Sequence, residues 1–199
     1  VRQFERRWTA PAKTGAELLD LVCGVLSDID LAFRSYDASS RDVLQSATGE
    51  PAVQTWLFEQ FELRANGRYQ VYREPEVKKK RKPDIVVSSA AAAVSVAVEA
   101  KHGGKQWTLK TLRRALKTQL AKNYLKPANR RHGVFVITNH SDRYWVDKEG
   151  GERLSFDQLI DRLRRDAHAI TRNEEGEICV RVAGIDASAE ADEQADQAA

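Results

Sequence analysis

Cysteine, methionine and long apolar runs are scarce or missing in this chain of 199 residues, which has two cysteines and no methionine. Cys23 and Cys179 belong to no CxxC or Cys/His cluster, so the sequence predicts no structural zinc site. No stretch approaches the ~20 consecutive apolar residues of a transmembrane helix, and the N-terminus, VRQFERRWTAP, lacks the apolar run of a secretory signal. We therefore expect a cytoplasmic protein with no membrane partner. The missing start methionine favours a piece of a longer protein, whose other domains would be further partners.

The net charge of +3 is small, but the positive charges are clustered. Clustered lysines and arginines favour polyanions such as nucleic acid, although each cluster can equally be a solvated surface. The last residues, EADEQADQAA, are instead acidic and polar. The candidate phosphate-binding residues are Lys78, Lys79, Lys80, Arg81, Lys82, Lys105, Lys110, Arg114 and Lys117.

Hydrophobic periodicity predicts an α/β protein. Apolar residues at helical spacing predict helices over residues 14–33, 49–63, 108–125 and 156–170. Thr14, with Glu17 three residues later, predicts a capping box at the start of the first helix. Alternating or continuous apolar residues predict strands over 68–73, 84–87, 94–99, 133–138 and 177–185. This order indicates a mixed central sheet flanked by helices. We expect an N-terminal helical extension over residues 1–47, one domain over 48–186 and an acidic disordered tail over 187–199.

The residues that indicate chemistry are Pro83-Asp84, followed after fourteen residues by Glu99-Ala100-Lys101. Residues two apart in a strand point to the same side, so Glu99 and Lys101 should share the face opposite the valines. If the two strands pair, Asp84 lies near Glu99. Two adjacent carboxylates are costly unless a cation or a proton relieves their repulsion. Magnesium prefers such oxygen ligands, so Asp84, Glu99 and the Ala100 carbonyl are its candidate ligands.

The segments RKPDIVVSS and VSVAVEAK resemble the motif of the PD-(D/E)xK nuclease superfamily, over residues 49–185 of this chain. The resemblance implies a restriction-endonuclease-like core and hydrolysis of phosphodiester bonds with Mg²⁺ or Mn²⁺, on DNA rather than RNA. Asp84, Glu99 and Lys101 would be catalytic. The resemblance also implies a bacterial parent protein with a role in antiviral defence or DNA processing. It leaves a homodimer open as a partner, because many nucleases of this fold cut both strands as dimers.

The superfamily also implies an acidic residue on the preceding helix and often a glutamine on the following one. Glu50 fits the first place, with Glu59, Glu62 and Glu74 as competitors, and Gln119 fits the second. Some branches carry Gln and Tyr four residues apart. Gln119 and Tyr124 are five apart, which separates them by roughly 140° on an α-helix unless the helix ends or bulges between them.

Each of these residues also has a purely structural interpretation. Asp84 can be a turn residue after a proline, and Glu99 with Lys101 an exposed pair on an edge strand. Glu50 can act on the helix dipole, and Gln119 can lie on the surface. His102 can assist proton transfer or be a bystander, and Trp107, Tyr144 and Trp145 can stack on bases or only pack. The functional alternative to a nuclease is a catalytically silent module of the same fold that binds nucleic acid or protein.

Overall fold

The computed structural model describes residues 10–35, 38–73, 82–104, 106–147, 151–173 and 177–188. The predicted helices are observed as α2 (Gly15–Ser35), α4 (Glu50–Leu63), α5 (Leu109–Ala115) continuing as the π-helix η1 (Leu116–Tyr124), and α6 (Phe156–Asn173). The predicted strands are β1 (Tyr69–Tyr72), β2 (Ile85–Ser89), β3 (Ser95–His102), β4 (His132–Asn139) and β7 (Cys179–Asp186). The sequence pattern did not predict α3 (Ala38–Gln45) or the short strands β5 (Trp145–Val146) and β6 (Arg153–Leu154).

The five long strands form one mixed sheet in the order β1-β2-β3-β4-β7. β1, β2 and β3 pair antiparallel, whereas β4 is parallel to β3 and β7 is parallel to β4. β3 is therefore a central strand, which contradicts the interpretation of Glu99 and Lys101 as an edge-strand pair. β3 and β4 end at the same side of the sheet, where parallel strands present their carboxyl ends.

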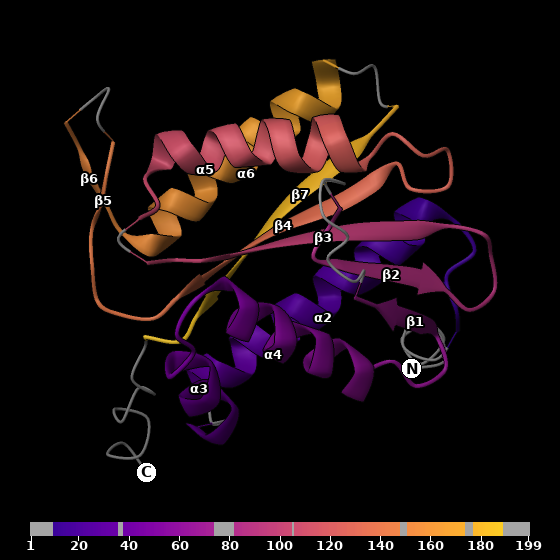
Figure 1. Cartoon of the computed structure of the whole chain (residues 1–199), viewed down its shortest axis with the longest axis horizontal. Coiled ribbons are helices and arrows are strands. Elements are labelled where there is room, and N and C mark those ends of the chain that lie inside the picture. The colour runs from indigo at the N-terminus through magenta and orange to yellow at the C-terminus, as the bar shows by residue number, and fades with distance from the viewer. Residues whose placement is uncertain are drawn as a thin grey trace, which may run out of the picture.

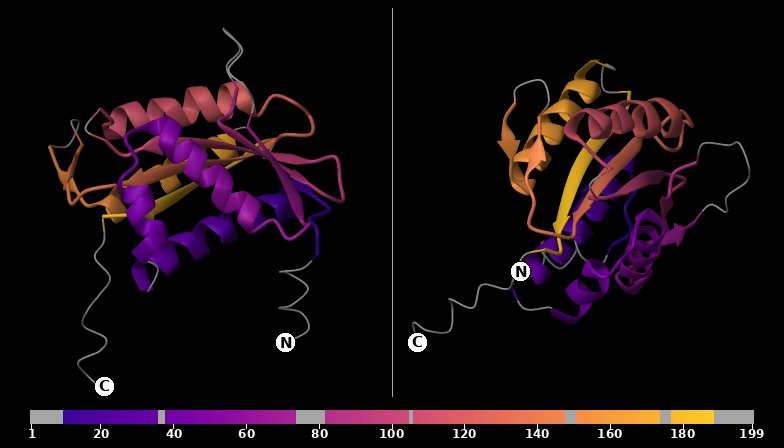
Figure 2. Two further views of the ribbon diagram at one scale, coloured as in Figure 1. Left: turned by 60° about the horizontal axis from the view of Figure 1, so that its bottom comes forward. Right: turned by 60° about the vertical axis from the view of Figure 1, so that its left-hand side comes forward.

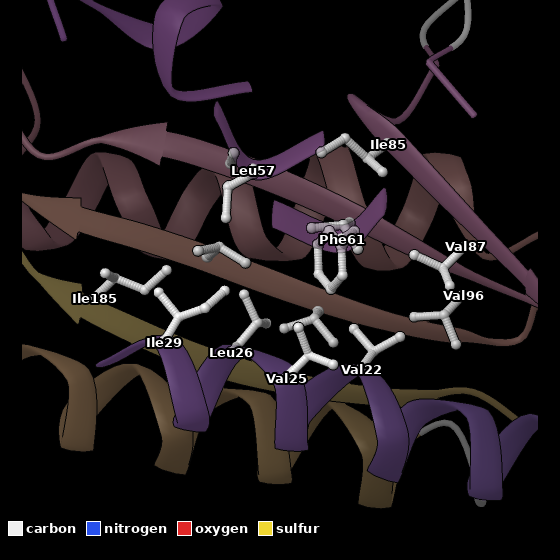
Figure 3. Packing of buried hydrophobic residues seen from close by; sticks show 14 of the residues in the cluster. Val22, Val25, Leu26, Ile29, Leu57, Phe61, Ile85, Val87, Val96 and Ile185 are labelled. Carbon is white, nitrogen blue, oxygen red and sulfur yellow. The ribbon is translucent and has the colours of Figure 1, made fainter. Parts of the chain in front are cut away.

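Helices cover both faces of the sheet, giving three layers (Figure 1). One core lies between the sheet and helices α2 and α4, and Figure 3 shows Val22 of α2 near Val96 of β3 and Ile29 of α2 near Ile185 of β7. The second core lies between the other face of the sheet and α5, η1 and α6. The chain is thus an α/β protein with a mixed five-stranded sheet between helices, as predicted.

Helix α2 packs inside the first core. Leu18, Leu19 and Val22 are fully buried there together with Val134 and Val136 of β4. Its N-terminus carries the capping box that the sequence predicts, because the Glu17 amide donates to Thr14 Oγ1 and the Thr14 amide donates to Glu17 Oε2. The helix therefore shares the core of residues 48–186, while the predicted tail lies almost wholly outside the described residues.

The β5–β6 hairpin stands off one end of the molecule in both Figure 1 and Figure 2. Trp145 and Leu154 turn inward and are almost completely buried, whereas Tyr144 and Val146 are exposed. Trp145 therefore packs in the second core, whereas the side chain of Tyr144 is mostly exposed to solvent. Within the described part of the chain, none of the helices combines the length and the apolar character needed to cross a membrane.

Gly103, directly after β3, packs so closely against β4 that it tolerates no side chain. Its amide donates to the Thr138 carbonyl at 2.8 Å, and an added Cβ would lie far inside contact distance of that oxygen and 3.3 Å from the Trp145 ring. We expect Gly103→Ala to lower the free energy of unfolding by about 1–3 kcal/mol, as overpacking does. Urea denaturation followed by circular dichroism measures it.

Gly24 on α2 is the matched control, because a Cβ there meets nothing within 4 Å. Gly24→Ala should leave stability unchanged or raise it by roughly 0.5–1 kcal/mol, since alanine favours a helix interior. Equal stability of Gly103→Ala and the wild type would contradict the packing argument.

Candidate active site

Asp84 and Glu99 meet where β2 begins. The last pair of the β2–β3 ladder is Ile85 with Val98, and one further step of this register sets Asp84 opposite Glu99. Directly opposed residues carry their Cβ atoms roughly 4.5–5.5 Å apart on one face. Val96 and Val98 pack in the core under α2 and α4, so Glu99 and Lys101 point to the opposite side of β3, as predicted.

Lys101 is at the centre of an ion-pair cluster. Its Nζ lies 2.8 Å from Glu99 Oε1 and 3.2 Å from Glu50 Oε2. Glu99 and Lys101 are only 2% and 4% exposed, so neither is a solvated surface charge. Buried ion pairs contribute little net stability, because desolvation offsets the attraction. The cluster therefore calls for a reason other than stability.

Asp84 closes the β2 end of the site. Its Oδ2 accepts a hydrogen bond of 2.8 Å from the Ala100 amide, so its side chain ties the start of β2 to β3. The amide and carbonyl of one strand residue point to the same edge, so the Ala100 carbonyl also faces Asp84. The residue opposite Ala100 in this register is Pro83, which has no amide hydrogen to donate. The Ala100 carbonyl is thus left without a ladder donor from β2.

The carboxyl groups of the site are hard to ionise. Burial, and next the charge of Asp84, raise the pKa of Glu99 to about 8. Burial also raises the pKa of Asp84, against the hydrogen bond from Ala100. Burial alone would lower the pKa of Lys101, but the charges of Glu99, Glu50 and Asp84 raise it. Lys101 is therefore a protonated donor, and Glu99 resists ionisation because it is buried beside Asp84.

Glu50 is the acidic residue of α4 that reaches this cluster. It lies at the start of α4, and its Oε1 accepts a hydrogen bond of 3.0 Å from Trp107 Nε1. The competitors Glu59 and Glu62 are exposed on later turns of α4, and Glu74 lies outside the described residues. Trp107 also places its ring 5.2 Å from Lys101 Nζ. Trp107 therefore contacts two members of the cluster: its indole binds Glu50, and its ring lies beside Lys101.

Gln119 lies on η1, which packs against β3 and β4. Its side chain is half-buried, and its Oε1 is buried with no hydrogen-bond partner in the described structure. A π-helix bonds residue i to i+5, so residues five apart come close to one face. The bulge that the spacing of Gln119 and Tyr124 requires is therefore present. Tyr124 is almost fully buried, whereas no contact described here joins Gln119 to the carboxylates.

The carboxyl pair fits a hard divalent cation. Glu99 Oε2 is buried without a hydrogen-bond partner in the part of the chain that is described, and a cation would remove the repulsion that raises the Glu99 pKa. No group of three His, Cys, Asp or Glu side chains within the described residues is arranged around a metal position. The available set is two carboxylates and one backbone carbonyl, and Mg²⁺ completes such sets with water.

The predicted nucleic-acid contacts are placed only in part. Lys110, Arg114 and Lys117 are exposed and follow one another at helical spacing on α5 and η1, so they form one outward-facing stripe. Lys82 is half-buried two residues before Asp84. Lys78, Lys79, Lys80, Arg81 and Lys105 lie outside the described residues. His102 is held by a 3.0 Å contact of its Nε2 with the Ala47 carbonyl.

Two features of the site were not predicted. The bond from Trp107 to Glu50 joins residues 57 positions apart, and no sequence pattern indicates it. Arg143, after β4, stacks on Trp145 and bonds to the Trp107 carbonyl. A basic residue just beyond the end of a buried strand was the only signal available. Comparison with family models, with curated proteins and with solved structures gives no match.

Proposed function

We propose that this protein is a metal-dependent nuclease that hydrolyses phosphodiester bonds, with Asp84, Glu99 and Lys101 at its centre. The observation that carries the proposal is the burial of two adjoining carboxyl groups and a lysine in one cluster. A strand that must only fill a core gains nothing from three such groups. A site that binds a cation and a phosphate uses all of them.

The fold supports the same proposal. Helix α4, strands β1–β3, helix α5 with η1, and strand β4 follow in the order of the PD-(D/E)xK core, and the motif residues lie on β2 and β3. Glu50 enters from the helix before the sheet and Gln119 lies on the helix after β3. We therefore assign the chain a restriction-endonuclease-like fold as part of the proposal.

Each residue of the centre has a role that its surroundings allow. Asp84, Glu99 and the Ala100 carbonyl would hold Mg²⁺ or Mn²⁺, which when bound supplies Lewis acidity toward the phosphate and lowers the pKa of water. The protonated Lys101 donates to a phosphate oxygen and balances the charge that develops there. Glu50 orients Lys101 from its second side. Gln119 offers an unused acceptor on the flanking helix.

DNA is the substrate proposed, with the stripe of Lys110, Arg114 and Lys117 contacting its backbone. No base-reading element is evident among the described residues, so cleavage should show weak sequence preference. A homodimer and further domains of a longer bacterial chain remain proposed partners.

The test is cleavage of linear and supercoiled DNA by the purified chain with Mg²⁺, with Mn²⁺ and with EDTA. We expect metal-dependent cleavage by the wild type. Asp84→Asn should abolish it, because the amide still accepts the Ala100 hydrogen bond but cannot supply an anionic ligand. Asp28→Asn, an exposed change on α2, is the control and should cleave like the wild type.

Absence of cleavage by the folded wild type in both metals would overturn the nuclease proposal. DNA binding without cleavage would then support the silent module. Cleavage that is equal in Asp84→Asn and the wild type would show that the activity belongs to another site.

A further inference from the structure

Arg143 is a half-buried cation with no counterion among the residues that the structure describes. Its guanidinium lies 3.6 Å from the centre of the Trp145 ring, and its Nη2 donates to the Trp107 carbonyl at 3.1 Å. Its Nε is buried with no hydrogen-bond partner, and no carboxylate of the described chain pairs with it. Burial alone lowers the pKa of this guanidinium, since no acidic neighbour raises it.

Two other partly buried arginines pair with carboxylates, and the buried Arg68 donates its Nε and Nη2 to backbone carbonyls. Arg113 pairs with Asp166 at 2.8 Å, and Arg162 pairs with Asp147 at 2.8 Å. A cation taken partly out of water without a partner costs free energy. An anionic ligand that pairs with Arg143 would offset this cost.

Trp107 connects this arginine to the proposed active site. The backbone carbonyl of Trp107 accepts from Arg143, its indole donates to Glu50, and its ring lies 5.2 Å from Lys101 Nζ. Arg143 follows β4, at the end of the sheet where β3 carries Lys101. The chain that leaves β4 runs past this end on its way to β5 (Figure 1). Trp107 thus contacts both Arg143 and the Lys101 cluster.

The stacked guanidinium is held ready for a planar, two-point contact. Stacking on an aromatic ring fixes the plane of an arginine, and its fork matches the oxygens of a phosphate. The hydrogen bond from Nη2 to the Trp107 carbonyl restricts rotation of the guanidinium group. No described side chain accepts from Nη1, which leaves that edge of the fork for an incoming oxygen.

We propose that Arg143 is a second phosphate-binding residue, which holds a nucleic-acid phosphate next to the one that meets Lys101. The inference rests on the proposed nuclease function and adds a contact that positions the strand. We expect a phosphodiester rather than a carboxylate as the ligand, because a nucleic-acid strand bound at Lys101 also carries neighbouring phosphates.

The test is binding of a fluorescent DNA duplex, followed by anisotropy in Ca²⁺ between about 50 and 200 mM salt. Arg143→Gln should weaken binding roughly tenfold and reduce the slope of log affinity against log salt by about one. Arg143→Lys keeps the charge, so the slope should stay while cleavage falls. Arg172→Gln removes an equal charge from the exposed end of α6 and should change neither. Thermal unfolding of each variant checks the fold.

The outcomes separate this inference from the function on which it rests. Weaker binding of Arg143→Gln with an unchanged salt slope would show a structural role and overturn the inference. Wild-type affinity and slope in Arg143→Gln, with cleavage intact, would overturn it while leaving the nuclease in place. A wild type that binds no DNA would overturn both.

Discussion

Replacing Lys101 by methionine should reduce DNA cleavage by roughly 10²–10³-fold, the cost of losing one preorganised donor at a developing charge. Methionine keeps much of the lysine's length and apolar stem, so the cavity beside Trp107 stays filled. The loss should fall on kcat, because the donor acts on charge that appears during the reaction. Single-turnover cleavage with saturating enzyme measures this step directly.

Lys126→Met is the matched control, because Lys126 is exposed just beyond η1. It should cleave at the wild-type rate. If Lys101→Met retained wild-type kcat and only its DNA affinity fell, Lys101 would be a binding residue and not a catalytic one.

Replacing Glu99 by glutamine should abolish cleavage and also make the metal-free protein more stable at alkaline pH. The folded protein keeps the Glu99 proton up to a pKa of about 8, because burial and the charge of Asp84 oppose ionisation. The unfolded chain releases that proton near the ordinary value of 4.5. The stability that the held proton provides is therefore complete below pH 4.5 and is lost as the pH rises through 8.

The useful window is pH 6.5 to 8.5. Burial, and next the charge of His102, lower the pKa of His140 to about 4, so this histidine adds a small rise in stability just above pH 6.5 that the wild type and Glu99→Gln share. Across the window the wild type should lose about 2 kcal/mol of unfolding free energy relative to Glu99→Gln. Urea denaturation in EDTA at several pH values measures both slopes.

Glu59→Gln serves as the control for this series, because Glu59 is exposed on α4. It should follow the wild-type decline. A decline of equal size in Glu99→Gln would mean that another group titrates in this window.

The sequence predicted the parts of the fold that depend on local pattern. The alternation of Val94, Val96 and Val98 placed Glu99 and Lys101 on the face opposite the valines, and the core confirms it. The helix and strand order predicted the mixed sheet. Thr14 and Glu17 predicted the capping box. Each of these signals lies within a few residues of its effect.

Other features depend on tertiary contacts. Helix α3 has the mostly polar sequence ASSRDVLQ, in which Leu44 is fully buried and Val43 is exposed, so no apolar stripe marks it as a helix. β5 and β6 are two residues each, too short for any periodicity. Glu50 differs from the exposed Glu59 and Glu62 by its contacts with Lys101 and Trp107, which join residues far apart in the sequence. The sequence signal for Arg143 was weak, because the lack of a counterion among the described residues is visible only in the three-dimensional structure.

Pro83 decides how far β2 and β3 can zip together. With any other residue there, an amide hydrogen would be available to the Ala100 carbonyl, and the hairpin could close by one more pair over the carboxylates. Proline prevents this pairing because it has no amide hydrogen. The β2–β3 ladder therefore ends just before the two carboxylates, and the Ala100 carbonyl would bind a cation without first losing a hydrogen bond to β2.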